Sequence, residues 1–161
     1  MGDNGTAKKI TSTFNGQSYE GGKGFATEAG THVPCIFLGA QIAPGVDTSL
    51  ICFEDFFVTL ADLAGISSNG YGIQDGVSFY PQLIGAAGNP RPWIYNYYVP
   101  ILQNPKDSNA IEWVQDYIYK VQLEDGKYSL RYVANDSNVV NPTDAEKQIR
   151  KSYKNIIANM H

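Results

Sequence analysis

The sequence lacks the features of membrane-spanning, nucleic-acid-binding and thiolate-metal proteins. No stretch approaches the roughly 20 apolar residues that span a bilayer. The net charge is -4, the pI is near 5.0, and the basic residues form no stripe, so nucleic acid is excluded as a partner. The two cysteines, Cys35 and Cys52, lack metal-type spacing. They are either buried free thiols or one disulfide.

The beginning of the chain, Met1 to Gly5, lacks the basic and apolar regions of a signal peptide. A signal, if the protein is exported, is therefore expected upstream of this chain. The composition is ordinary for a globular protein, with 43% apolar and 17% charged residues. The 161 residues suffice for one domain or for part of a larger one. Eleven tyrosines indicate half-buried strands, with ligand stacking as the alternative.

Residues 21–34 form the most unusual stretch, Gly-Gly-Lys-Gly-Phe-Ala-Thr-Glu-Ala-Gly-Thr-His-Val-Pro. Lys23 lies among glycines, which allow the backbone to approach a ligand closely, and its ammonium brings a compact charge with three donors. The pattern is not a nucleotide-binding P-loop, because Lys23 precedes Gly24 where that motif has a serine or threonine. The stretch therefore predicts a site for an oxyanion such as sulfate.

Asp3, Asn4 and Gly5 resemble a loop at the end of a strand. A carboxylate and an amide oxygen suit a hard cation such as Ca²⁺ or Mg²⁺. Turn chemistry explains the same three residues equally well, so the tripeptide leaves both interpretations open.

The first half of the chain predicts a mixed α/β arrangement. Asn15-Gly16 indicates a loop or short hairpin, and the apolar run from Val33 to Leu38 predicts a buried strand. A helix is expected over Glu54–Ala64, ended by Gly65. Its apolar face would comprise Phe56, Phe57, Leu60, Leu63 and Ala64. Ser78 would cap a short helix that runs through Leu83.

The second half follows a rigid connector, Asn89-Pro90-Arg91-Pro92, which predicts a division into subdomains at 1–90 and 91–161. A strand is expected at 93–99, followed by an antiparallel meander over 112–115, 117–123 and 127–133, with a turn at Glu124-Asp125-Gly126. Thr143 to Glu146 form a capping box for a final helix. Its apolar stripe comprises Ala145, Ile149, Tyr153, Ile156, Ile157 and Met160.

The order of these motifs resembles the C-terminal part of the sulfatases, sulfuric ester hydrolases of the alkaline phosphatase superfamily. The resemblance is specific over about residues 2–90 and looser beyond Trp93. The motifs that carry it are Gly2-Asp3-Asn4-Gly5, Gly22-Lys23-Gly24 through Glu28 and Gly30 to Val33-Pro34, Pro44-Gly45, Asp55 through Leu60, Asp62 to Gly65 and Asp75-Gly76-Val77. It implies an α/β fold, a C-terminal fragment of the alkaline-phosphatase-like fold, with a small antiparallel sheet and a C-terminal helix.

The resemblance also implies functions for particular residues. Asp3 and Asn4 match the family's late pair of metal ligands, usually on calcium, and Lys23 matches the lysine that contacts the sulfate. His32 stands where many members have arginine and receives no function. Glu28 and Asp55 match recurring positions, for which loop bracing or capping is the expected contribution.

One motif of the family is absent from these 161 residues. The family nucleophile is a formylglycine made within Cys/Ser-x-Pro-x-Arg, which neither Cys35 nor Cys52 matches. We therefore expect a fragment that begins just inside the metal site, with Met1 an internal methionine or a cloning start. Alone it would be inactive and bind metal weakly or not at all. Exposed strand edges would favour homo-oligomers. The intact enzyme would act on a sulfated small molecule or glycan in a periplasmic, secreted or lysosomal setting.

Two alternatives stay open at the level of sequence. The chain could be a self-contained, non-catalytic α+β binding module with an aromatic surface around Trp93, Tyr95, Trp113 and Tyr117. It could also belong to a phosphate or phosphonate ester hydrolase of the same superfamily, although the Gly-Lys-Gly stretch is more similar to sulfatases.

Overall fold

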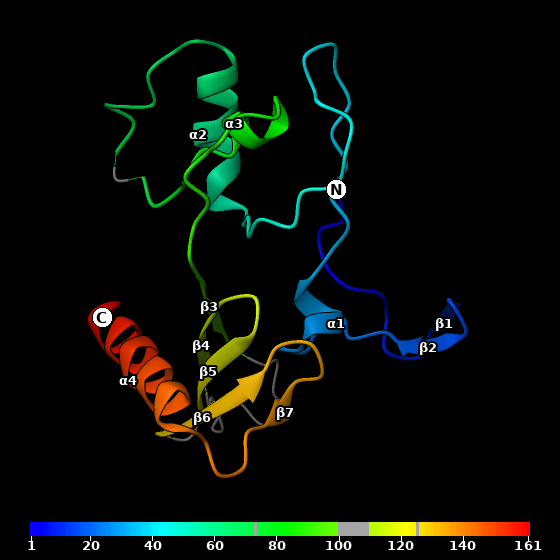
Figure 1. The fold of residues 1–161 in the computed structure, drawn as a ribbon, viewed down its shortest axis with the longest axis vertical. Helices are drawn as coiled ribbons and strands as arrows, with labels where there is room; N and C mark the ends of the chain where they lie inside the picture. Colours follow the sequence, from blue (N-terminus) through cyan, green and yellow to red (C-terminus); the bar gives the residue numbers. More distant parts are fainter. Residues whose placement is uncertain (73, 100–109, 125) are drawn as a thin grey trace. The chain divides into compact units, whose positions relative to one another are not determined.

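The computed structural model describes residues 1–72, 74–99, 110–124 and 126–161 (Figure 1). They form two compact units. The first joins Met1–Cys35 to Tyr95–His161, and the second is Ile36–Ile94. The compact units thus follow other boundaries than the sulfatase subdomains expected at 1–90 and 91–161, and that family division stays a prediction.

A sheet of five strands, in the order β3-β4-β5-β6-β7, organises the first unit. The strands are β3 (Ile94–Tyr98), β4 (Ile111–Gln115), β5 (Tyr119–Glu124), β6 (Lys127–Tyr132) and β7 (Ser137–Asn138). The pairs from β4 to β7 are all antiparallel, which confirms the predicted meander. The predicted turn at 124–126 includes Asp125, which lies outside the described residues.

The two faces of this sheet bury different kinds of side chain, because successive residues of a strand point to opposite sides. Val114 and Val121 are paired across β4 and β5 on one face, and both are buried. On the other face Gln115 is paired with Lys120, and Trp113 with Gln122. These four polar and aromatic residues are buried as well, so both faces of the sheet are covered.

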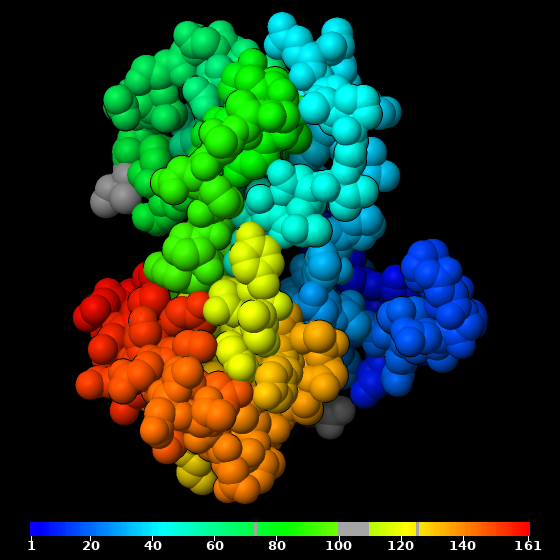
Figure 2. All heavy atoms as spheres, in the orientation of Figure 1, coloured from blue at the N-terminus to red at the C-terminus, as the bar shows by residue number. Residues whose placement is uncertain are grey.

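The C-terminal helix α4 (Asp144–Asn159) covers the Val121 face. In Figure 2 its atoms, orange to red, lie directly against those of the yellow strands. The predicted capping box is confirmed: the Thr143 hydroxyl accepts from the backbone of Glu146, whose carboxylate accepts from the backbone of Thr143. Ile157 is the buried residue of the predicted stripe, whereas Ala145 is exposed and does not pack on the sheet.

The N-terminal part of the first unit contains a protruding hairpin, β1 (Thr11–Phe14) and β2 (Gln17–Glu20), drawn in blue in Figures 1 and 2. Asn15 and Gly16 both have positive φ, 50° and 76°, as a type I′ turn requires, so the hairpin interpretation is confirmed. A short helix, α1 (Glu28–Thr31), follows.

The second unit contains the helices α2 (Glu54–Leu63) and α3 (Tyr80–Leu83), both close to the predicted bounds. Gly65 ends α2 with φ 66°. The predicted apolar face of α2 is largely wrong. Phe57, Leu60 and Leu63 are exposed, and the buried positions are Asp55, Val58, Thr59 and Ala61. The helix is thus rotated so that its small and polar residues face inward.

The strand expected at 33–38 is also wrong: this segment runs extended without strand pairing, and Ile36 and Leu38 are 77% and 94% exposed. An apolar run becomes a strand only beside a partner backbone that continues the ladder, and among the described residues the bond from the Gly2 amide to the Pro34 carbonyl does not grow into one. Both cysteines are half-buried free thiols. In the described part of the chain, no helix has the length and apolar character needed to cross a membrane.

Replacing Thr143 by alanine removes the side-chain acceptor of the capping box. We expect Thr143→Ala to lower the free energy of unfolding by about 1 kcal/mol, measured by urea titration with circular dichroism. Ser152→Ala is the matched control, because Ser152 is an exposed position within the same helix. An equal loss in both variants would contradict a capping contribution.

Candidate functional site

Three segments of the first unit meet around Lys23 through their backbones. The amide of Lys23 donates to the carbonyl of Thr6 at 2.9 Å, and the amide of Gly5 donates to the carbonyl of Gly30 at 3.0 Å. The amide of Gly2 donates to the carbonyl of Pro34 at 3.1 Å. The Asp3-Asn4 loop and the glycine–lysine stretch are therefore parts of one backbone cluster.

Glycine is needed where these segments touch. A Cβ atom on Gly5 would lie 2.0 Å from the carbonyl oxygen of Ala29, and one on Gly22 would lie 2.7 Å from the carbonyl carbon of the same residue. No side chain fits at such distances, so a larger residue at either position would push the segments apart. Close backbone packing thus explains why Gly5 and Gly22 are glycine.

The predicted site residues Asp3, Asn4 and Lys23 all have exposed side chains. Their backbones belong to the same cluster, and their polar groups are available to a ligand. Exposure is ordinary for aspartate, asparagine and lysine, so binding of a metal or of sulfate by these side chains stays a prediction.

Two side chains from the sheet reach this cluster, and sequence analysis missed both. The Tyr98 hydroxyl donates to the carbonyl of Gly24 at 2.5 Å, and the Lys120 ammonium donates to the carbonyl of Ala26 at 2.9 Å. Lys120 is also 2.8 Å from the Asp136 carboxylate. The one sequence signal was a lysine in the middle of a strand whose neighbours are buried.

An open cleft of about 270 Å³ lies beside the cluster. Asn4 and His32 contribute polar groups to its wall, and Tyr19 and Glu20 of β2 line it as well. The His32 ring nitrogen Nδ1 lies 2.6 Å from the Glu28 carboxylate, one turn earlier in α1. Glu28 therefore orients the exposed His32 ring, consistent with the bracing contribution expected for Glu28.

The residues fit a hard cation only in part. The carboxylate of Asp3 and the amide oxygen of Asn4 are the oxygen donors that Ca²⁺ or Mg²⁺ prefers. Calcium takes about six to eight oxygens, so these two residues would supply a minority of its ligands. Within the described ranges, no three His, Cys, Asp or Glu side chains converge as a metal site.

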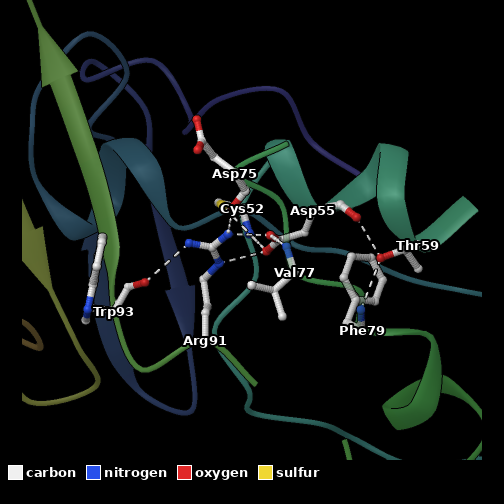
Figure 3. Close-up of polar contacts among 8 residues, drawn as sticks. All are labelled: Cys52, Asp55, Thr59, Asp75, Val77, Phe79, Arg91 and Trp93. Carbon is white, nitrogen blue, oxygen red and sulfur yellow. Dashed lines mark hydrogen bonds and ion pairs between the residues drawn. The ribbon is translucent and has the colours of Figure 1, made fainter. Parts of the chain in front are cut away.

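The second unit is organised around a buried carboxylate, Asp55, which is 1% exposed (Figure 3). One carboxylate oxygen accepts from the Val77 amide at 2.7 Å and the other from the Cys52 amide at 2.8 Å. The guanidinium of Arg91 donates to both oxygens, with Nε at 3.0 Å from Oδ2. Arg91 also donates to the carbonyl of Trp93 at 3.4 Å.

Electrostatics within this cluster favour charged Asp55. Burial alone would raise the pKa of Asp55, but the Arg91 guanidinium and the amides of Val77 and Cys52 hold it below its ordinary value. Burial also raises the pKa of the Cys52 thiol, with the neighbouring carboxylates adding to the effect. Cys52 is therefore a protonated structural thiol rather than a nucleophile, and Asp55 connects three loops, as the bracing interpretation predicted.

Trp113 and Tyr95 do not form the aromatic surface that a binding module would need. Trp113 is 2% exposed and donates through its ring nitrogen to Gln115 at 3.0 Å. The Tyr95 hydroxyl donates to Glu112 at 2.8 Å, and burial together with this carboxylate raises the pKa of Tyr95 to about 12. These side chains serve the interior of the unit rather than a stacking platform.

Two solved structures are similar to this chain. A Bacteroides thetaiotaomicron VPI-5482 protein classed among the sulfatases matches 89% of this chain and 32% of its own, with 21% identity and a TM-score of 0.67. A 2-O GAG sulfatase matches 66% of this chain and 23% of its own, with 20% identity and a TM-score of 0.51. No protein-family model and no curated protein sequence matches the chain.

At these identities the likeness establishes the fold. The chain has a sulfatase-like α/β fold, and the predicted class, the C-terminal part of that fold with a small antiparallel sheet and a final helix, is confirmed. The chain spans about a third, 32%, of the length of the first structure. Activity, metal and substrate of the whole protein are accordingly matters of proposal.

Asp55→Asn should destabilise the second unit severely, because it leaves the Arg91 guanidinium, whose side chain is 11% exposed, without its charge partner. We expect a loss of about 3 to 5 kcal/mol in the free energy of unfolding, measured by urea titration. Asp75→Asn, the same change at an exposed carboxyl, is the control and should stay within about 0.5 kcal/mol of the parent. Equal stability of the two variants would show that the ion pair is dispensable.

The same carboxylate makes stability depend on pH. Because the folded pKa of Asp55 is depressed, its contribution is fully present above the unfolded value of about 4 and disappears as pH falls through the folded pKa. Thermal unfolding followed from neutral pH downward should show this loss in the Asp75→Asn variant. Asp55→Asn, which lacks the titrating group, should show a flatter profile, and parallel profiles would contradict the assignment.

Proposed function

We propose that this chain is part of a sulfatase in which Lys23 binds the sulfate group of a sulfate ester. One arrangement of Lys23 carries the proposal. Its amide donates to the carbonyl of Thr6, next to the Asp3-Asn4 loop, at 2.9 Å, and its side chain is exposed. The sulfatase-like fold supports the same conclusion.

Sulfate ester hydrolysis needs positive charge more than acid–base machinery. A nucleophile attacks sulfur, and the bond from sulfur to the ester oxygen breaks. The electron pair of that bond stays on the departing ester oxygen, which takes up a proton to become the alcohol. Throughout the step, negative charge is carried by the oxygens that surround sulfur. A preorganised ammonium at those oxygens stabilises the transition state, typically by a hundredfold or more in rate for one donor. Lys23 offers such a charge on a flexible stem, with three donors that can follow the oxygens as the bond breaks.

Asp3 and Asn4 would hold a divalent cation, Ca²⁺ or Mg²⁺, through their side-chain oxygens. When bound, this cation would neutralise sulfate charge and orient the group for attack. The remaining ligands and the formylglycine nucleophile would come from residues outside this chain, since its 161 residues contain no Cys/Ser-x-Pro-x-Arg motif. The chain alone would thus bind a cation weakly and would not turn over substrate.

A sulfated glycan is the substrate class that we favour over a small sulfated molecule. One similar structure is a 2-O GAG sulfatase. Lys23 does not line the cleft, but the wall of the cleft contains Asn4, His32 and Tyr19, which suit the hydroxyl groups and faces of sugars. A phosphate ester hydrolase would use the same charges, so phosphate esters belong in the test.

Lys23→Ala tests the proposal in the protein with its complete sulfatase fold. We expect kcat/KM for an aryl sulfate to fall by about a hundredfold, because one oxyanion donor is removed. Lys9→Ala is the matched control, since Lys9 is another exposed lysine in the same unit. Stopped assays that quantify released sulfate give the rates.

The outcomes separate the rival functions. Equal rates for Lys23→Ala and Lys9→Ala would refute sulfate binding by Lys23. Faster turnover of the phosphate ester than of the sulfate ester would assign the protein to phosphate ester hydrolysis. Turnover by the 161-residue chain alone, above its own Lys23→Ala variant, would overturn the proposal that the nucleophile lies elsewhere.

A further inference from the structure

Two side chains of the sheet hold the peptide groups that directly follow Lys23. The carbonyl of Gly24 accepts from the Tyr98 hydroxyl at 2.5 Å, and the carbonyl of Ala26 accepts from the Lys120 ammonium at 2.9 Å. Tyr98 belongs to β3 and Lys120 to β5. The stretch after Lys23 is therefore attached to the sheet at two points, one on each side of Phe25.

The Lys120 ammonium is charged and almost wholly buried. Its side chain is 3% exposed, its nitrogen lies 2.8 Å from Asp136 Oδ1 and 5.6 Å from the centre of the Trp113 ring. Asp136 also pairs with Arg131 at 3.1 Å, so the carboxylate is fixed in turn. Replacing a buried ion pair by apolar residues of similar volume is often neutral or stabilising, so stability alone does not explain a lysine here.

An ammonium at this place supplies something that an apolar side chain cannot, namely a donor for the carbonyl of Ala26. The chain before Lys23 is restrained as well, because a Cβ atom on Gly22 would collide with Ala29 and the Lys23 amide is bonded to Thr6. Both sides of Lys23 are thus anchored while its side chain is exposed. The backbone of Lys23 is therefore held in place, whereas the side chain that carries the charge extends from the surface.

We propose that Tyr98 and Lys120 are positioning residues for Lys23, which hold the stretch 24–26 so that the Lys23 ammonium meets the sulfate oxygens. The inference rests on the proposed function of Lys23. Neither residue needs to touch the substrate. The charge of Lys120 is compensated by Asp136, so Lys120 contributes through the geometry of the loop rather than through attraction for an anion.

A displaced donor affects the transition state most. Errors of about 1 Å in the position of a catalytic group can cost on the order of a hundredfold in rate. An interaction realised only in the transition state lowers kcat and kcat/KM together when it is lost, whereas loss of uniform binding raises KM alone. A positioning residue for Lys23 should therefore change kcat.

The test is a double-mutant cycle in the protein with its complete sulfatase fold. Tyr98→Phe removes only the hydroxyl and should lower kcat for an aryl sulfate by about tenfold, with KM nearly unchanged. Tyr97→Phe, the same change at the exposed neighbouring position of β3, is the control and should leave kcat at the parent value. In a Lys23→Ala background, Tyr98→Phe should have no further effect, because the group that it positions is gone.

A second test compares kcat of Lys120→Met with kcat of Lys120→Arg. Lys120→Met should lower kcat as Tyr98→Phe does, and Lys120→Arg should restore part of it, because arginine keeps both charge and donors. If Lys120→Met does not fold, the Tyr98 cycle decides the question by itself. The hydroxyl deletion removes no buried charge and is the milder change.

The possible results separate this inference from the proposed function. A loss in Lys23→Ala together with a non-additive loss in Tyr98→Phe supports positioning. A loss in Lys23→Ala with no effect of Tyr98→Phe, or with effects that multiply independently, overturns the inference and leaves the function of Lys23 intact. No loss in Lys23→Ala overturns both.

Discussion

The contact between the Lys120 ammonium and the carbonyl of Ala26 attaches the candidate site to the sheet. It joins the middle of the five-stranded sheet to the loop that carries Lys23, across 94 positions of sequence. The charge is tolerated in the interior because Asp136 neutralises it and Trp113 offers a ring face. The loop in turn covers the polar face of the sheet, so sheet and site stabilise each other.

Local chemistry was readable from the sequence, whereas long-range contacts were not. Asn15-Gly16 sets the hairpin, and Thr143 with Glu146 begins the last helix, because each motif satisfies its hydrogen bonds within a few residues. Lys23 was proposed from the glycines around it and from the order of motifs, and its binding of sulfate stays a prediction. Tyr98 and Lys120 were missed because their bonds to the carbonyls of Gly24 and Ala26 join residues that are far apart in the sequence and belong to no motif.

The errors have a common physical cause. The run Val33–Leu38 was expected to be a buried strand, and Leu60 was placed on the inner face of its helix. Hydrophobicity predicts that a residue would gain by burial, but it does not supply the surface that buries it. In the second unit, Asp55 occupies that inner position instead, because Arg91 and two amides compensate its charge. Hydrogen bonds and an ion pair to Asp55, rather than an apolar helix face, hold those loops together.

The discontinuity of the first unit has a consequence for biosynthesis. Residues 1–35 and 95–161 form one unit, and residues 36–94 are an insertion between them. A chain leaves the ribosome from its N-terminus, at about 5–20 residues per second. The loop that carries Lys23 thus leaves the ribosome before the strand β5 that holds it. The contacts that hold this loop would therefore form only after residues 36–94 have been synthesised.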